Sequence, residues 1–396
     1  MKRRIIRIFL ALLILAILVQ IPFIYRCYRL GQVAERIRRS NDTRSPGTAR
    51  DHKGVIHVHS THTGEIGDSF NELLNASCDN QLDFVLLTEH YSTAYDTSAH
   101  VLNGKYGPTL FVAGNEINTR PGDRFLMLPG GPDASEMRLM QTAQSIEKVH
   151  YTSRLAFMAY PANFSAWETP FDGIEVFNLS DTAREVNPIV AGFDLVWSSG
   201  YPALNLARYI TRPSANLQKF DEIAARRHMV LLAGLDAHSG LGIHLLGDEL
   251  GGKFVGLKLD PYERVFRIAR IHIPADGELT RESLLAAIGR GSFFNGFDVS
   301  GDTTGFRFTG RSGERTAAMG DDLPLTSGAT LNIIAPIPAR IVVLKNGEKL
   351  RDEIGVTEVR VEITEAAAYR VEVYRHDLGS PFDEIPWILS NPIFVR

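Results

Sequence analysis

Between Gly54 and about residue 300, short apolar runs alternate with stretches whose apolar residues recur at helical spacing. The apolar runs include "GVIHVH", "DFVLLTEH", "TLFVAGNEI", "RFLMLP", "RLAFMAYP", "GIEVFN" and "MVLLAGL". The helical stretches between them include "SEMRLMQTAQSIEKVHY" and "LQKFDEIAARRH". Alternation of strand and helix is typical of an α/β protein with a parallel sheet or barrel, in which ligands bind at the carboxyl ends of the strands.

Four of these apolar runs end in side chains that bind metals. The paired residues are His57 and His59, Glu89 and His90, Asn115 and Glu116, and Asp236 and His238. Imidazole and carboxylate are the ligands of borderline divalent cations, and strand ends that meet at one edge can converge on a single ion cluster. Because side chains alternate along a strand, His57 and His59 share a face. The pattern therefore predicts a metal centre in which the carboxylate of Glu116 can bridge two ions.

The remaining histidines and the cysteines do not extend this pattern. A lone histidine at a strand end is more often solvated or buried in the core than a ligand, and this interpretation covers His52, His100, His228, His272 and His376. His62 and His150 fit no ligand spacing and stay open. Cys27 and Cys78 are too few for a disulfide framework or a thiolate metal site, so nitrogen and oxygen ligands are expected.

The N-terminus carries the apolar run "IIRIFLALLILAILVQIPFIY" behind Lys2, Arg3 and Arg4. Roughly 20 residues at about 1.5 Å per residue span a bilayer, which predicts a single transmembrane helix within residues 1–25. A cleaved signal peptide is the alternative, but no small-residue cleavage pattern follows the run. Cationic residues flank both sides and do not decide the orientation. Retention of the short cationic tail in the cytoplasm would leave the larger part, with its catalytic domain, extracytoplasmic.

The rest of the chain divides by composition. Residues 26–53 are polar, contain Ser-Pro-Gly and are expected to be a linker, followed by the α/β domain over residues 54–300. Residues 301–396 contain "TLNIIAP", "ARIVVLKNG", "TEVRVEI" and "AYRVEVYRH", which predict a β-sandwich-like C-terminal domain. A net charge of -4 supplies no basic field for a phosphate backbone, so nucleic acid is not an expected partner.

The motifs "HVHS", "LLTEH", "GNEI" and "GLDAHS", in this order, resemble the PHP family, named for its polymerase and histidinol phosphatase members. The resemblance covers about residues 54–300, and the ending "PWILSNPIFVR" is similar to endings in membrane-associated or secreted relatives regarded as metal-dependent phosphoesterases. It implies a distorted (β/α)7 barrel that holds two or three divalent metal ions, such as Zn, Mn or Fe.

The resemblance also implies roles for individual residues. The residues that match one metal position are His57, His59, Glu116 and Asp236. Those that match another are Glu65, His90 and His238. Of these ligands, Glu116, Asp236 and His238 are implied to take part in catalysis. Glu89 stands where the family usually has aspartate, and Tyr160 of "AYPAN" stands where it commonly has the histidine of His-Pro. Asn178 would be a weak oxygen ligand, so two metals are expected rather than three.

Such a centre would support hydrolysis. Two cations lower the pKa of a bridging water and stabilise the oxygens of an in-line displacement, which favours a phosphate ester of a small molecule or a lipid as substrate. Three arginines downstream of ligand strands are candidates for phosphate binding, although each is also compatible with a solvated surface position: Arg120, Arg124 and Arg184. The alternatives are a hydrolase of carboxylic esters or carbamates at the same metals, or a non-catalytic membrane-tethered binding module.

Overall fold

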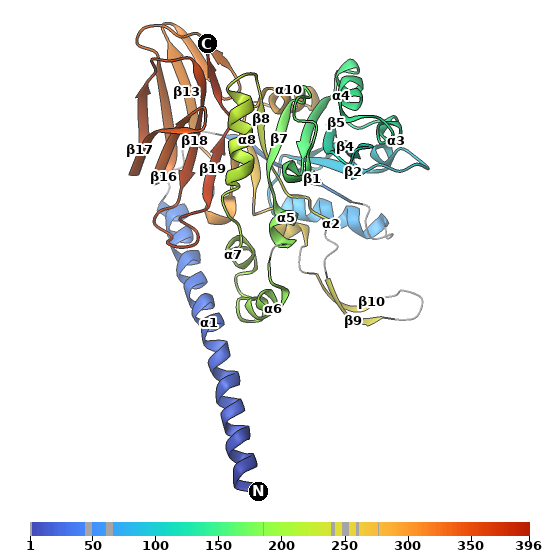
Figure 1. The fold of residues 1–396 in the computed structure, drawn as a ribbon, viewed down its shortest axis with the longest axis vertical. Helices are drawn as coiled ribbons and strands as arrows, with labels where there is room; N and C mark the ends of the chain where they lie inside the picture. Colours follow the sequence, from blue (N-terminus) through green and yellow to red (C-terminus); the bar gives the residue numbers. More distant parts are fainter. Residues whose placement is uncertain are drawn as a thin grey trace.

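The computed structural model describes residues 2–43, 50–60, 66–184, 186–238, 242–247, 253–258, 261–275 and 277–396. It is a mixed α/β protein with one large mixed sheet, and a long N-terminal helix projects from it (Figure 1). Glu65 and His62 lie outside the described residues, so the predicted role of Glu65 as a metal ligand stays a prediction.

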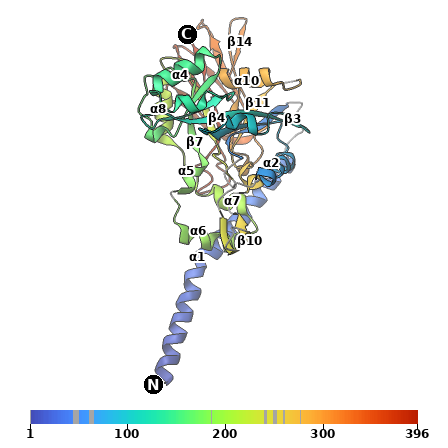
Figure 2. The ribbon, with the colours of Figure 1, turned by 90° about the vertical axis from the view of Figure 1, so that its right-hand side faces the viewer.

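The N-terminal helix α1 runs from Lys2 to Thr43. Its length and apolar composition fit a membrane span or a signal sequence. The first half projects away from the rest of the molecule in both views (Figures 1 and 2). Most of the apolar side chains in this half are exposed.

The second half of α1 packs on the domain. Residues 26–43 were expected to belong to a polar linker, but they are helical, and Leu30 and Val33 are buried in the main core. Ala34 and Ile37 pack against the same core, which gives an apolar stripe at the spacing of one helix face. The Nη1 atom of Arg36 donates a hydrogen bond of 2.5 Å to the carbonyl oxygen of Asp377. The polar composition of this segment reflects its solvated face and conceals the buried one.

Seven strands form a hydrogen-bonded circuit around the inner core. They are β1 (Asp51–Val58), β2 (Phe84–His90), β4 (Thr109–Asn118), β5 (Arg124–Leu128), β6 (Leu155–Ala159), β7 (Gly173–Asn178) and β8 (Val230–Gly234). Neighbours pair in this order, in parallel except at β4–β5 and β5–β6, which are antiparallel. The backbone N–H groups of Leu235 and Ala237, just after β8, donate to the carbonyl oxygens of Ile56 and His57 in β1. These bonds bring the end of β8 to the end of β1.

Helices and short elements lie between these strands and after the last of them. The helical elements are α2 (Ile66–Asp79), η1 (Thr97–His100), α3 (Ala134–Met137), α4 (Thr142–Tyr151), η2 (Pro161–Asn163), α5 (Leu179–Arg184), α6 (Pro188–Trp197), α7 (Pro202–Ala207), α8 (Ser214–Ala224), α9 (Tyr262–Val265), α10 (Arg281–Arg290) and η3 (Asp298–Ser300). The short strand β3 (Gly104–Tyr106) pairs with β4. The strands β9 (Gly242–Gly247) and β10 (Lys253–Lys258) form a separate antiparallel pair.

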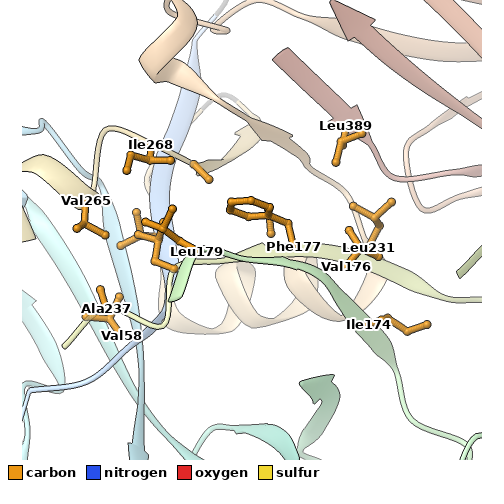
Figure 3. Close-up of a cluster of buried hydrophobic side chains, with 14 of the residues drawn as sticks. Val58, Ile174, Val176, Phe177, Leu179, Leu231, Ala237, Val265, Ile268 and Leu389 are labelled. Atoms are coloured by element: carbon orange, nitrogen blue, oxygen red, sulfur yellow. The ribbon is translucent and has the colours of Figure 1, made fainter. Parts of the chain in front are cut away.

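Alternate residues of the circuit strands belong to two hydrophobic clusters. On β4, Val112 lies in the cluster inside the circuit, whereas Phe111 and Ala113 lie in the outer cluster, which the helices cover. Figure 3 shows part of the outer cluster, where Phe177 of β7 and Leu231 of β8 lie near Leu389. The carboxyl ends of the strands are therefore held by packing on both faces of the sheet.

The C-terminal part of the described chain is β-rich, as expected, and contains no α-helix after residue 301. Its strands are β13 (Arg307–Ser312), β14 (Arg315–Ala318), β15 (Asp322–Leu323), β16 (Thr330–Lys345), β17 (Glu348–Glu362), β18 (Ala367–Tyr374), β19 (Pro386–Ser390) and β20 (Ile393–Val395). They enclose a second hydrophobic core. The strands β11 (Arg270–Pro274) and β12 (Phe294–Gly296) join this part to β1, because β11 pairs with β1 and β12 pairs with β19.

Candidate metal centre

Four buried side chains from three strand ends converge at one end of the circuit. His57 and His59 come from the end of β1, Glu116 from β4 and Asp236 from the segment after β8. One ligand atom from each lies within 4.8 Å of the others. The backbones of His57 and Asp236 take positive φ values of 62° and 49°, which non-glycine residues rarely adopt. The hydrogen bonds between the ends of β1 and β8 stabilise this conformation and bring the side chains together.

The ligand atoms of this group are buried without hydrogen bonds. Nε2 of His57 and of His59, Oε2 of Glu116 and Oδ1 of Asp236 have no hydrogen-bond partner among the described residues. The distances from the two Nε2 atoms to these oxygens are 3.5 to 3.6 Å, too long for good hydrogen bonds. A buried polar atom without a partner costs about 1–3 kcal/mol, so four of them in one place need an explanation. Two imidazole nitrogens and two carboxylate oxygens fit the coordination sphere of a divalent cation.

A second group of three histidines adjoins the first. His59, His90 and His238 present nitrogen atoms within 4.8 Å of one another. The rings of His90 and His238 stack against that of His59, with centroids 4.5 and 4.2 Å away. Nδ1 of His90 lies 3.3 Å from Oε2 of Glu116, so this one oxygen faces imidazoles of both groups. Glu116 could therefore contribute a ligand atom to either group.

Glu175 was missed by sequence reasoning, although it is fully buried beside the first group. Its Oε1 atom lies 2.6 Å from Nδ1 of His57, and its Oε2 atom accepts a hydrogen bond from Asn178. An Nδ1–H that donates to Glu175 leaves the lone pair of Nε2 directed at the other ligands. The available signal was a carboxylate inside the otherwise apolar strand run "GIEVFN". Gly234 makes room for it, because a Cβ there would lie 1.7 Å from Oε1 of Glu175.

The electrostatics of the group favour a cation. Burial would raise the pKa of Glu116, but the imidazoles of His57, His59 and His90 hold it at about 2. Burial would lower the pKa of His57, but the charges of Glu175 and Asp236 raise it well above its ordinary value. The negative charge of these carboxylates therefore stabilises a positive charge next to Nε2 of His57. A proton and a divalent cation compete for the same lone pair of His57.

Tyr160 lies next to the ligands. It follows β6 with a φ of 51°, and its hydroxyl donates a hydrogen bond of 2.7 Å to Oδ2 of Asp236. Burial raises the pKa of Tyr160, and the charges of Glu116 and Asp236 raise it further, so the phenol stays a neutral donor. The hydroxyl therefore orients Asp236 so that its other oxygen faces His57 and His59.

Three further polar residues from the strand ends form hydrogen bonds in the local structure. Glu89 accepts hydrogen bonds from the backbone and hydroxyl of Ser60, so it anchors the segment after β1. The Oδ1 atom of Asn178 accepts from the backbone N–H of Asp181 at the start of α5. Asn115 bonds to Thr97 and to the backbone of Gly131.

A cleft of about 510 Å³ opens beside Glu116 and His90. Two arginines line it, of which Arg124 was predicted from the sequence and Arg138 was not. Arg124 Nη1 lies 3.2 Å from Oε1 of Glu116, and its guanidinium lies over the ring of Tyr160. The guanidinium of Arg138 lies over the ring of Tyr91, and its Nε is buried with no hydrogen-bond partner among the described residues.

Among the residues that the structure describes, Arg120 is not part of the lining of this cleft. Arg120 is exposed, and its backbone N–H donates to the carbonyl oxygen of Met140. Arg184 ends α5, and its side chain lies outside the described part of the chain. Their predicted contact with substrate stays a prediction.

Comparison with known proteins leaves the family open. No family model and no curated protein matches this chain. Among solved structures, the chain is similar to PsfC from Pseudomonas syringae, with 12% sequence identity and a TM-score of 0.35. That match covers 60% of this chain and 88% of the other.

Proposed function

We propose that this protein is a metal-dependent phosphoesterase whose α/β part is a distorted (β/α)7 barrel of the PHP type. The observation that carries the proposal is the set of four buried ligand atoms, two imidazole nitrogens and two carboxylate oxygens, that face one another without hydrogen bonds. The adjoining group of His59, His90 and His238 supports a second cation next to the first. The circuit of seven strands supports the barrel.

Different residues would have different roles in such a site. Bound divalent cations supply the Lewis acidity that activates a water for attack on a phosphate ester. Glu175 holds the ring of His57 in one orientation and one tautomer. Tyr160 holds the carboxylate of Asp236 by its hydroxyl. Arg124 and Arg138 would bind the phosphate oxygens of a substrate in the cleft, since guanidinium groups form strong paired hydrogen bonds with phosphate.

Two cations fit the donors better than three. Tyr160 stands where the resemblance to the PHP family implies a further histidine, a ligand for a third metal, and its neutral hydroxyl is already bonded to Asp236. Asn178 uses its oxygen at the start of α5. We propose two cations, drawn from Zn, Mn and Fe, at His57, His59, His90, Glu116, Asp236 and His238.

Metal analysis combined with hydrolysis assays tests the proposal. The full chain is purified in detergent, its metal content is measured by elemental analysis, and it is assayed with chromogenic phosphodiester, phosphomonoester and carboxylic ester substrates. The expected result is about two equivalents of metal and chelator-sensitive hydrolysis of a phosphate ester. Activity on the carboxylic ester alone would favour the esterase alternative, and bound metal without hydrolysis would favour a binding module.

A matched pair of histidine variants assigns the metal to this site. His59→Ala should lose metal and activity, because His59 belongs to both groups. His150→Ala removes a histidine that pairs with Asp172 at 3.0 Å and lies in neither group, and it should retain both. Equal metal content in the two variants would place the ions elsewhere.

We also propose that α1 spans the membrane, with the larger part of the chain on the extracytoplasmic side and a phosphorylated small molecule or lipid as substrate. The length and composition of α1 support a span. Addition of a membrane-impermeant protease to intact cells tests the orientation, since it should cleave the larger part only if that part lies outside.

A further inference from the structure

The short helix α6 presents an apolar face to the outside of the molecule. Ile189 and Val196 are 70% and 72% exposed, and Phe193 and Trp197 are more than one third exposed. These residues follow one another at the spacing of a single helix face. A surface helix of a water-soluble protein normally turns such a stripe toward the core. The polar side chain of the helix, Asp194, is fully buried instead.

Asp194 is buried because α6 packs on α1 and α7. Its carboxylate forms ion pairs with Arg26 of α1 at 3.1 Å and with Arg208 at 3.0 Å, and it accepts a hydrogen bond from Tyr209. The helix is thus fixed with its charged side against the protein. Its apolar side is left facing outward.

The contacts with α1 place α6 at a particular depth. The ring of Phe193 lies 5.1 Å from that of Phe23, and the indole N–H of Trp197 donates a hydrogen bond of 2.8 Å to Gln20. Gln20, Phe23 and Arg26 form the last turns of the apolar run of α1, where a membrane-spanning helix leaves the hydrocarbon core. Figures 1 and 2 show α6 beside α1 at the end of the domain nearest the N-terminus.

We propose that α6 is a second membrane contact, which inserts its apolar face into the interfacial layer of the same bilayer that α1 spans. This inference rests on the proposed span of α1. The features agree with an interfacial helix, in which apolar residues enter the boundary between headgroups and acyl chains and a tryptophan lies at headgroup level. The exposed apolar surface of α6 is continuous with that of α1 through Phe23 and Phe193.

The contact would orient the metal centre. The helix α5 begins directly after Asn178 at the carboxyl end of β7, and α6 follows it. The β9–β10 pair follows the end of β8 and extends on the same side as α6 (Figure 1). The strand ends that carry the ligands therefore lie toward the bilayer, which holds the site near lipid headgroups.

Depth measurements with single fluorescent labels test the proposal in the full chain. In a Cys27→Ser, Cys78→Ser background, Val196→Cys is labelled and the protein is reconstituted into phosphatidylcholine and phosphatidylglycerol vesicles that contain a spin-labelled lipid. Tyr151→Cys is the matched control, because Tyr151 is an 89% exposed aromatic residue on α4, a helix that lies away from α1 in Figure 1. Leu15→Cys reports on α1 itself. All three side chains are exposed, so the substitutions should not disturb folding.

The expected result is that lipid spin labels quench Val196→Cys about twofold or more above Tyr151→Cys, while iodide in the buffer quenches Tyr151→Cys more strongly. Quenching of Leu15→Cys by lipid without quenching of Val196→Cys would overturn the role of α6 and leave the anchor intact. Protection of Val196→Cys from both quenchers would show a second protein chain on this face and overturn the proposal. Absence of lipid quenching at Leu15→Cys would remove the anchor, and the α6 contact with it.

Discussion

Nδ1 of His57 lies 2.6 Å from Oε1 of Glu175, and both side chains are fully buried. The pair fixes which nitrogen of His57 faces the other ligands, because the hydrogen on Nδ1 is directed to the carboxylate. Burial raises the pKa of Glu175, and the imidazole of His57 opposes that rise. Glu175 would therefore affect metal affinity indirectly, because it orients His57.

Replacement of Glu175 should weaken metal binding. Glu175→Gln keeps an oxygen for Nδ1–H but removes the charge, and metal affinity should fall roughly 10- to 100-fold. Competition with a chromogenic chelator measures the affinity. Asp172→Asn is the matched control, because Asp172 pairs with His150 outside both ligand groups. If metal affinity fell equally in the two variants, the effect of Glu175→Gln would be a general effect on folding.

If Glu116 bridges two cations as we propose, its removal should release more metal than removal of an imidazole from one group. Oε2 of Glu116 faces His57, His59 and His90, so Glu116→Ala should lose more than one equivalent of metal by elemental analysis. His238 belongs only to the second group, so His238→Ala should lose mainly one ion. Hydrolysis of the phosphate ester should fall in both variants. Loss of the same number of ions in each would argue against a bridge at Glu116.

Substitution of Tyr160 tests the number of metals. Tyr160→His adds an imidazole beside Asp236 and should raise the metal content by up to about one equivalent. Tyr160→Phe removes only the hydroxyl and should add no metal, which makes it the control. A wild-type protein that already holds three equivalents, unchanged in Tyr160→His, would contradict the proposal of two cations.

The buried His272, which belongs to neither ligand group, predicts a pH dependence of stability. Nε2 lies 3.2 Å from Oδ2 of Asp298, and Nδ1 lies 3.6 Å from Oδ2 of Asp51. Burial would lower the pKa of His272, but Asp298 and Asp51 raise it above its ordinary value. A raised folded-state pKa stabilises the protein below the unfolded pKa of about 6.5, and this stabilisation is lost as pH rises through the folded pKa.

We therefore expect His272→Gln to lower the free energy of unfolding by about 1–3 kcal/mol at pH 6, and by less at higher pH. Thermal unfolding of wild type and variant at several pH values measures the difference. The exposed His100 supplies the control substitution His100→Gln. A difference in stability that stayed constant or grew above pH 7 would show that His272 is neutral in the folded protein.

Full-length protein should stay with membranes through carbonate extraction, because α1 is proposed to span the bilayer.

The second half of α1 should also be needed for the stability of the folded protein. A chain that starts at Arg26 keeps Leu30 and Val33 in the core, whereas one that starts at Gly54 loses them, at about 1.5–3 kcal/mol for each buried side chain. The shorter chain should therefore unfold at lower denaturant concentration. Equal midpoints for the two would show that this packing contributes little.

Local patterns in the sequence were enough to predict the strands that precede the ligands and the polar residues that end them, but not the helix over residues 26–43. The apolar runs before His57, His90, Glu116 and Asp236 are strands or strand ends as expected, because burial on both faces requires continuous apolar residues. The β-rich C-terminal part and the long apolar N-terminal helix follow from composition in the same way. These features depend on residues that are close in the sequence, so the sequence alone is enough to predict them.

Only the tertiary structure decided which of these groups meet. Asp236 reaches His57 because the segment after β8 bonds to β1, and Asn391 of the C-terminal part supports β8 by accepting from the backbone N–H of Leu231. The sequence could not identify Glu175 as the partner of His57, because the two residues meet only when β7 and β1 fold around one core. The same holds for α6, whose apolar residues could equally have faced inward. Helical spacing groups side chains on one face, but the ion pair between Asp194 and Arg26 determines where that face points.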